Sequence, residues 1–369
     1  MKKTSLKILG LERNPYNDNL FGALQSGNFN VTVFYTVANT ATKNNTSWGE
    51  LAKPNFEYKY ISKYTFWKLL NILFKSREET FIFTGYASFS FLISMALCVL
   101  FKINFLVFTD VPVVDSKRGF LRGVARGFAR WLAFFKSDGV LTTGTPGRNA
   151  LIRLGCDETK IVNYPYTPSL YDMSEVAPNE LSQLPIMSEC PVILFSGQLI
   201  YRKGVDVLLY ALHILKRRGV EFQAIVEGDG PMMGFLRELC IQLEIHDDVH
   251  FTGFNNSKIH AVFMHRANIV VSPSRWEPWG NIVPEAMSAG KVVIASSSVA
   301  SAADRITNDV NGLIFQTDNP AQLVSHLSRA ILDAGFSERL STEAKNSAEI
   351  WTADMNAIFL ASYLNAKFI

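Results

Sequence analysis

The feature that most constrains the fold of this chain is the alternation of short apolar runs with helical segments along almost its whole length. Runs of four to eight β-branched and aromatic residues bounded by turn residues predict strands. In the first half such runs lie near residues 6–11, 31–36, 56–61, 80–85, 104–110, 139–144 and 160–164. In the second half they lie at 192–197, 222–228, 248–254, 268–274, 291–296 and 311–316. This alternation predicts an α/β protein with doubly wound parallel sheets.

A proline-rich segment separates the two halves. It has no sustained periodicity and holds Pro165, Pro168, Pro178, Pro185 and Pro191. Such a composition is typical of a linker, and 369 residues suit two domains. We therefore expect two Rossmann-like domains facing a central cleft. The expected boundaries are 1–168 for the first domain, 169–190 for the linker, 191–350 for the second domain and 351–369 for a C-terminal helix that packs back on the first.

Composition and charge describe a globular protein with a basic first half. Hydrophobic residues make up 48% of the chain and charged residues 19%, as in proteins with large cores. Residues 1–165 hold 21 Lys and Arg against 11 Asp and Glu, a net +10, and the remainder holds 15 against 22, a net −7. This asymmetry predicts an anionic surface or ligand for the first half. The four cysteines lie far apart, which favours buried free thiols in a cytosolic chain.

One segment is long enough to cross a bilayer. Residues 81–101 carry no charge, but residues 80–85 have the composition of a strand that ends at Gly85. Residues 88–101 then favour a buried helix, so we expect a βαβ unit of the core rather than a membrane span. The apolar stretch at the N-terminus is too short for a signal peptide, and we expect none.

Two adjacent cations mark the start of the second domain. Arg202 and Lys203 lie between a strand that ends at Gly197 and a helix that begins near Gly204. That position is the carboxyl edge of the sheet, where such folds bind ligands. An Arg fork beside a Lys point charge suits a diphosphate; a solvated basic turn is the alternative. Nearby, Gly228 would allow a nucleotide to approach the backbone closely.

Glu277 and Glu285 flank a stretch broken by Pro278 and Pro284. A pair of carboxylates can be an acid and base, a metal site or a contact for hydroxyl groups. The prolines argue against one continuous helix, so Glu277 is expected in a loop. A helix should then begin near Asn281, which can cap it, with Glu285 in its opening turns.

The surroundings of the pair favour hydroxyl groups. The chain has no Asp-x-Asp for a metal site, and no histidine lies within the motif, although an acid–base pair stays open. The free N–H groups of Ile282 and Val283 are expected to form an anion site at the helix start. Phosphate at that site, with the two carboxylates on neutral hydroxyls, fits a nucleotide sugar.

These motifs together resemble the GT-B glycosyltransferases of the family 4 type. The two Glu separated by seven residues, the sequence FSGQLIYRKG at 195–204, VEGDGP at 226–231 and residues 142–166 all have counterparts there. The resemblance implies that Arg202 and Lys203 neutralise the donor diphosphate, that Glu277 contacts the sugar hydroxyls and that Glu285 holds the ribose diol. It also implies donor contacts at Gly197, Gly228, Gly253, Phe254, Gly280, Asn281, Ile282 and Val283.

The family resemblance further implies a reaction with retention that needs no metal and no cofactor besides the donor substrate. The departing phosphate would take the proton of the acceptor, so Arg202, Lys203 and Glu277 are the expected catalytic residues. The chain has no histidine before His213, where relatives often use one near the reaction centre. Asp110, at the end of a predicted strand, is the substitute candidate for contact with the acceptor.

The expected function is transfer of a sugar to a glycan or lipid-linked glycan in cell-envelope or extracellular polysaccharide synthesis. An alternative is a non-catalytic nucleotide-sugar-binding or scaffold subunit of a glycan-assembly complex, and a third is epimerisation of a sugar nucleotide.

Residues 117–136 repeat Arg118, Arg122, Arg126 and Arg130 at four-residue intervals among aromatic residues. This pattern favours contact with anionic lipid, although a domain helix with a solvated Arg face would look the same. No motif indicates nucleic acid, and we expect a cytoplasmic protein attached to the inner face of the membrane.

Overall fold

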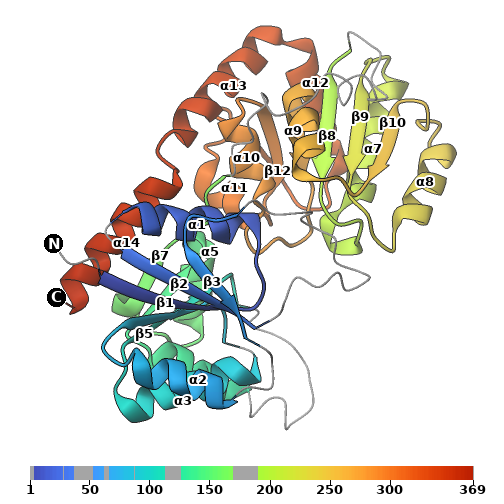
Figure 1. Cartoon of the computed structure of the whole chain (residues 1–369). Helices are drawn as coiled ribbons and strands as arrows, with labels where there is room; N and C mark the ends of the chain where they lie inside the picture. Colours follow the sequence, from blue (N-terminus) through green and yellow to red (C-terminus); the bar gives the residue numbers. More distant parts are fainter. Residues whose placement is uncertain are drawn as a thin grey trace. The chain divides into compact units, whose positions relative to one another are not determined.

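The alternating strands and helices form two parallel sheets, one in each of two units of the chain (Figure 1). The computed structural model describes residues 4–27, 29–36, 53–61, 66–86, 88–112, 126–168 and 190–368. Unit 1 consists of Met1–Thr46, Glu50–Thr167 and Thr352–Ile369, and unit 2 of Ser47–Gly49 and Pro168–Trp351. Residues 169–189 of the predicted linker lie outside the described residues.

The sheet of unit 1 has the strand order β3-β2-β1-β4-β5-β6-β7, with every pair parallel. Its strands are β1 (Thr4–Gly10), β2 (Phe29–Tyr35), β3 (Glu57–Tyr60), β4 (Thr80–Phe83), β5 (Phe105–Thr109), β6 (Gly139–Thr142) and β7 (Ile161–Asn163). Ile8 lies opposite Val33 on one side and Ile82 on the other. The inner strands are apolar on both faces because helices cover both.

Two helical layers cover the unit 1 sheet. On one face, α1 (Pro15–Ser26) packs beside α14 (Ala353–Phe368), whose Leu360 and Leu364 enter the core of this unit. On the other face lie α2 (Phe66–Lys75), α3 (Phe89–Phe101) and the π-helical turn η1 (Trp131–Lys136). The helix α5 (Gly144–Arg153) joins β6 to β7. Therefore α14 belongs to unit 1, the same unit as β1.

The apolar stretch 81–101 is divided between β4 and α3, as the βαβ interpretation predicts. Phe91, Met95 and Cys98 of α3 are fully buried against the sheet. Among the helices in the described ranges, none combines the length and apolar character needed to cross a membrane.

The predicted basic helix lies partly outside the described residues, which exclude Arg118 and Arg122. Residues 126–130 are helical, and the helix then widens into η1. Arg126 and Arg130 are half-buried, so neither is a fully solvated member of a stripe.

The sheet of unit 2 has the order β10-β9-β8-β11-β12-β13 and is also parallel. Its strands are β8 (Val192–Ser196), β9 (Gln223–Glu227), β10 (Val249–Gly253), β11 (Ile269–Ser272), β12 (Val292–Ser296) and β13 (Leu313–Phe315). Its helices are α7 (Val205–Arg217), α8 (Met233–Gln242), α9 (Ser257–Arg266), α10 (Ile282–Ser288), α11 (Ala300–Arg305), α12 (Pro320–Leu332) and α13 (Ala334–Ala348). One apolar core lies on each face of this sheet.

Candidate functional site

The strand order of the unit 2 sheet changes direction between β8 and β11. From β8 the chain adds strands towards β10, and from β11 it adds strands towards β13 on the opposite side. Loops that leave such a strand pair diverge at the carboxyl edge, which is where open α/β sheets bind ligands. The loop after β8 contains η4 (Tyr201–Lys203), and the loop after β11 contains Glu277. The predicted cations and the first predicted carboxylate therefore meet at one place in the fold.

Glu277 is paired with both cations of η4. Its Oε2 atom lies 3.1 Å from Nη1 of Arg202 and 2.5 Å from Nζ of Lys203. Nη1 of Arg202 also donates a hydrogen bond of 2.8 Å to the backbone oxygen of Trp276. Because Glu277 is 8% exposed, water screens these ion pairs weakly. A single carboxylate thus fixes two cations side by side, and the trio keeps a net positive charge.

Arg275 joins the two loops. Its guanidinium makes a two-pronged contact with Asp206 in the first turn of α7, at 2.9 Å and 2.7 Å. Nη1 also donates to the backbone oxygen of Tyr201 at 2.8 Å, and the guanidinium lies 4.0 Å from the centroid of the Tyr201 ring. The sequence analysis missed this residue. Arg275 lies two residues before Glu277, but its partner Asp206 is 69 residues away in the chain.

Glycines allow the loops at this edge to pack backbone against backbone. Gly228 has a φ of +126°, and a Cβ atom there would overlap the backbone oxygen of Gly197. Gly204, with a φ of +66°, would in the same way overlap the backbone oxygen of Pro273. Gly228 is predicted to let a nucleotide approach the backbone, but the packing of these loops also requires glycine at this position.

The loop that begins at Glu277 is held by the segment before and within α11. The N–H of Glu277 donates to the backbone oxygen of Ser298 at 3.1 Å, and its backbone oxygen accepts from the N–H of Ala300 at 3.1 Å. The Ser301 hydroxyl donates to the backbone oxygen of Gly280 at 2.8 Å. These contacts fix the path of the chain into α10.

The start of α10 lies where it is predicted, but two expectations about it are wrong. Asn281 occupies the N-cap position without a capping hydrogen bond, because its backbone is helical (φ −56°, ψ −27°) rather than extended as a capping residue requires. Within the described part of the chain, its Oδ1 atom is buried without a hydrogen-bond partner. The N–H of Val283 is not available to an anion either, because it donates to the backbone oxygen of Gly280 at 3.1 Å.

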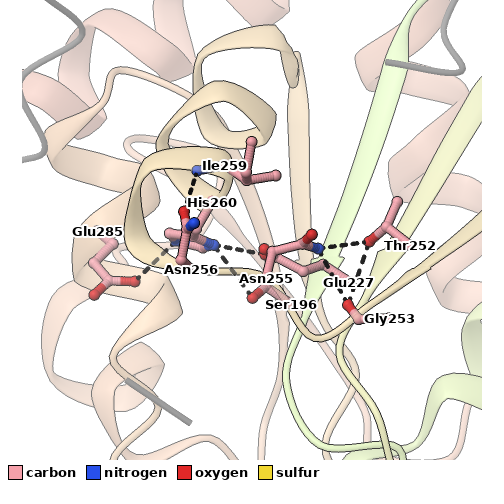
Figure 2. A network of polar contacts seen from close by, with 9 residues as sticks. All are labelled: Ser196, Glu227, Thr252, Gly253, Asn255, Asn256, Ile259, His260 and Glu285. Atoms are coloured by element: carbon pink, nitrogen blue, oxygen red, sulfur yellow. Dashed lines mark hydrogen bonds and ion pairs between the residues drawn. The ribbon is translucent and has the colours of Figure 1, made fainter. Parts of the chain in front are cut away.

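Glu285, in the opening turns of α10 as predicted, faces a histidine that the sequence analysis did not consider. Figure 2 shows His260 between Glu285 on one side and Glu227 with Ser196 on the other. Nδ1 of His260 lies 2.6 Å from Oε2 of Glu227, and Nε2 lies 3.7 Å from Oε2 of Glu285. Burial alone would lower the pKa of His260, but hydrogen bonds and attraction to the two carboxylates outweigh it and raise the pKa to about 10.

Local structure explains how His260 reaches this place. The Asn256 side chain caps α9 by accepting a hydrogen bond of 3.0 Å from the N–H of Ile259, which fixes the first turn that carries His260. Asn255 ties the preceding loop to the end of β10 through Thr252 and Gly253 (Figure 2). A signal was present in the sequence, since Glu227 ends a buried strand and a buried carboxylate needs a partner.

The other predicted residues take separate places. Gly253 ends β10 with a φ of +72°, and the Phe254 side chain beside it is exposed. Asp110 follows β5 in unit 1 and hydrogen-bonds Tyr166; burial first, and then Asp110, raise the pKa of that phenol well above its usual value. Across the described residues, no three His, Cys, Asp or Glu side chains gather in a way that could hold a metal ion.

Residues 177–347 match the family model described as glycosyl transferases group 1, and this range includes Arg202, Lys203, Glu277 and Glu285. An uncharacterized glycosyltransferase of Methanocaldococcus jannaschii is 32% identical over 193 residues, which cover 51% of this chain and 49% of the relative. A D-inositol 3-phosphate glycosyltransferase of Jonesia denitrificans is 29% identical over 199 residues, or 52% of this chain and 46% of that relative. The chain thus spans about half the length of these relatives.

Solved structures match almost the whole chain. The Anabaena protein HepE, in complex with UDP, aligns with a TM-score of 0.78 at 15% identity and covers 98% of this chain and 100% of HepE. WaaG, a glycosyltransferase involved in lipopolysaccharide biosynthesis, aligns with a TM-score of 0.69 at 17% identity, over 97% of this chain and 99% of WaaG. At such identities the likeness shows the fold, and the prediction of a GT-B fold with two Rossmann-like units is confirmed.

Proposed function

We propose that this protein is a glycosyltransferase of the family 4 type that moves a sugar from a nucleotide-sugar donor to a glycan or lipid-linked glycan. The observation that carries the proposal is the grouping of Arg202, Lys203, Glu277 and Glu285 at the carboxyl edge of the unit 2 sheet. Cations of this kind suit a diphosphate, and carboxylates accept hydrogen bonds from sugar hydroxyls. The match of residues 177–347 supports this activity, as does the likeness to HepE, which was also solved with UDP-glucose.

In the proposed reaction, the bond between the anomeric carbon and the diphosphate oxygen breaks while the acceptor oxygen bonds to that carbon with retention. The acceptor proton passes to the departing phosphate. Arg202 and Lys203 would stabilise the charge that develops on the diphosphate, so the proposal includes no metal or cofactor. Oε2 of Glu277 is engaged by the two cations, and we propose that Oε1 accepts a hydrogen bond from a sugar hydroxyl. Asp110 is proposed to contact the acceptor.

The site assignment can be tested through donor binding and turnover. UDP-, GDP- and ADP-sugars are screened by thermal shift, because a ligand that binds the folded state raises the unfolding temperature. The Glu285→Ala and Arg202→Ala variants should lose this shift. The control variants Glu349→Ala and Arg217→Ala, which change exposed residues, should keep it. Acceptor-dependent release of nucleoside diphosphate that is unchanged in Glu285→Ala and Arg202→Ala would contradict the assignment.

The same assays separate the alternatives. Donor binding without release of nucleoside diphosphate, across a broad panel of glycan and lipid-linked acceptors, would favour a non-catalytic binding or scaffold subunit. Conversion of the donor into its epimer in the absence of an acceptor would favour sugar-nucleotide epimerisation. Analysis of the anomeric configuration of the product tests retention, and an assay in excess chelator tests independence from metal.

We further propose that unit 1 contacts an anionic membrane on its cytoplasmic face, where lipid-linked acceptors for cell-envelope or extracellular polysaccharide synthesis would be met. The layer formed by α2, α3 and η1 exposes large apolar side chains: Trp67, Phe74, Phe89, Leu100, Phe101, Phe128, Trp131 and Phe135. Trp67 and Phe89 are each 78% exposed. Lys136 lies 4.9 Å from the centroid of the Trp131 ring, and a basic group beside exposed aromatic side chains suits a membrane interface.

Vesicle flotation tests the membrane proposal. Recovery should be higher with anionic than with neutral vesicles, by roughly 1 kcal/mol per basic residue at the surface. Replacing Arg118, Arg122, Arg126 and Arg130 with Gln, or Trp67 and Phe89 with Ser, should reduce recovery. The control Phe235→Ser changes an aromatic residue of unit 2 that is 56% exposed. Equal recovery with both vesicle types would refute the proposal.

A further inference from the structure

The cluster of Glu227, His260 and Glu285 holds two residues, Glu227 and His260, that the proposed reaction does not use. It draws one residue from each of β9, α9 and α10. Glu227 and Glu285 are 4% and 6% exposed, and the His260 side chain is 14% exposed. Buried carboxylates are costly unless they are paired, so their gathering around one imidazole calls for an explanation.

The geometry favours a positively charged His260. A neutral imidazole has one N–H donor, whereas the imidazolium has two. Here both ring nitrogens face carboxylate oxygens, Nδ1 towards Glu227 at 2.6 Å and Nε2 towards Glu285 at 3.7 Å. Among the described groups that face the ring from the packed elements are these two carboxylates and the neutral Ser196 of β8, whose hydroxyl lies 3.5 Å from Nδ1. The raised pKa of His260 agrees with this arrangement.

The two carboxylate oxygens of Glu285 differ in their surroundings. Its Oε2 atom faces His260, while its Oε1 atom is buried and has no hydrogen-bond partner among the residues that the structure describes. Figure 2 shows this second oxygen pointing away from the imidazole. A buried carboxylate oxygen left without a donor costs free energy. Donors from a bound molecule would remove that cost, and neutral hydroxyls fit because the site already holds two carboxylates.

We infer that His260 is a positioning residue for the donor: held by Glu227, it orients Glu285 so that Oε1 accepts a hydrogen bond from the ribose diol of the nucleotide. The inference rests on the proposed nucleotide-sugar site and adds to it two residues, Glu227 and His260, that touch no substrate. A carboxylate oxygen held beside an imidazolium is a strong hydrogen-bond acceptor.

Paired ligands give the sharpest test. The affinities of UDP, GDP and ADP are measured by calorimetry, and the tightest is compared with its 2′,3′-dideoxy form, which lacks the diol. The wild type should bind the ribose form about tenfold or more tightly than the dideoxy form, as expected for a hydrogen bond to a charged acceptor. His260→Gln should weaken binding of the ribose form and leave the dideoxy form nearly unchanged. The control His265→Gln, an exposed position on the same helix, should behave as the wild type.

The outcomes are distinct. If none of UDP, GDP and ADP binds, the proposed function fails, and this inference fails with it. If one binds and His260→Gln keeps the wild-type preference for ribose, the inference is wrong while the proposed function stands. If His260 had a purely structural role, His260→Gln would weaken the binding of both ligand forms equally, and that result would also overturn the inference.

A second variant and a spectroscopic measurement can still test the inference if the His260→Gln protein does not fold. Glu227→Gln leaves the imidazole in place but removes the carboxylate nearest to it, and it too should reduce the preference for ribose. In the wild type, the nitrogen-15 shifts of His260 in the NMR spectrum should be those of an imidazolium from pH 6 to about pH 9. A neutral imidazole at pH 8 would overturn the inference.

Discussion

At the scale of single residues, the proposed donor site is organised around Glu277. Its Oε2 atom is shared by Arg202 and Lys203, so the two cations are already neutralised in part when no donor is bound. A diphosphate brings its own negative charge to the same cations. The carboxylate therefore competes with the ligand that its loop is proposed to bind, and Glu277 should affect affinity and turnover in opposite directions.

Glu277→Gln tests this competition. We expect the free energy of unfolding to fall by about 1–3 kcal/mol, because two partly buried cations lose their shared anion. Binding of the nucleoside diphosphate should become tighter, while the rate of sugar transfer falls because a sugar hydroxyl loses its acceptor. Calorimetry and steady-state kinetics measure the two effects, with the exposed Glu338→Gln as control. Weaker binding of the diphosphate in Glu277→Gln would show that no competition exists.

The charge of His260 makes stability depend on pH. Its pKa in the folded protein is about 10, against 6.5 for an ordinary histidine. The bound proton therefore stabilises the fold fully below pH 6.5, and its contribution declines as pH rises and is lost above about pH 10. The difference in the free energy of unfolding between the wild type and His260→Gln should thus shrink from pH 6 to pH 10. Denaturant titrations measure it, and a difference independent of pH would contradict the assignment of charge.

At the scale of elements, Arg275 couples η4 and α7 to the loop after β11. Arg275→Lys should lower the free energy of unfolding by about 1–3 kcal/mol, because an ammonium group cannot reproduce the two-pronged contact with Asp206. The Arg275→Lys and Asp206→Asn variants and their combination form a double-mutant cycle. Additive losses in that cycle would mean that the two side chains do not stabilise the loops together.

Two glycines of unit 2 predict opposite effects of the same substitution. Gly228→Ala should destabilise unit 2 by several kcal/mol, because the Cβ atom overlaps the backbone oxygen of Gly197 and the φ of +126° is unfavourable for alanine. Gly234→Ala, in the first turn of α8 where no atom of the described residues lies within 4 Å of the added Cβ, should stabilise by about 0.5 kcal/mol. Thermal unfolding of both variants measures the difference, and a stable Gly228→Ala would mean that the β8 and β9 loops are not packed as described.

The sequence predicts those features of the elements that depend on residues close together in the chain. The strands, the division of residues 81–101 and the separation of Glu277 from Glu285 depend on neighbouring residues, and the structure has them as predicted. The pairing of Glu277 with two cations 74 and 75 residues earlier depends on the order of β8 and β11 in the sheet. The partners of His260 come from β9 and α10 and likewise follow from topology, which no spacing along the chain shows.

At the scale of the whole molecule, the two units have separate cores, and α14 contributes to that of unit 1. Leu360→Ala removes a fully buried side chain of α14 and should cost unit 1 about 2–5 kcal/mol. Donor affinity should be unchanged, since all the side chains proposed to bind the donor belong to unit 2. The control Ile358→Ala, at a side chain that is 61% exposed, should have little effect. Calorimetric unfolding with and without nucleotide separates the two transitions; a loss confined to the nucleotide-sensitive transition would contradict this division.

The return of α14 to unit 1 has a consequence for the order in which the protein is made. Domains usually fold as units, and the N-terminal domain usually folds first during synthesis. Here the ribosome must translate all of unit 2 before residues 353–368 exist to cover α1. The nascent chain can therefore complete unit 2 while unit 1 still exposes part of its core. A chaperone that follows this chain during translation should remain on the segment synthesised first until the last helix emerges.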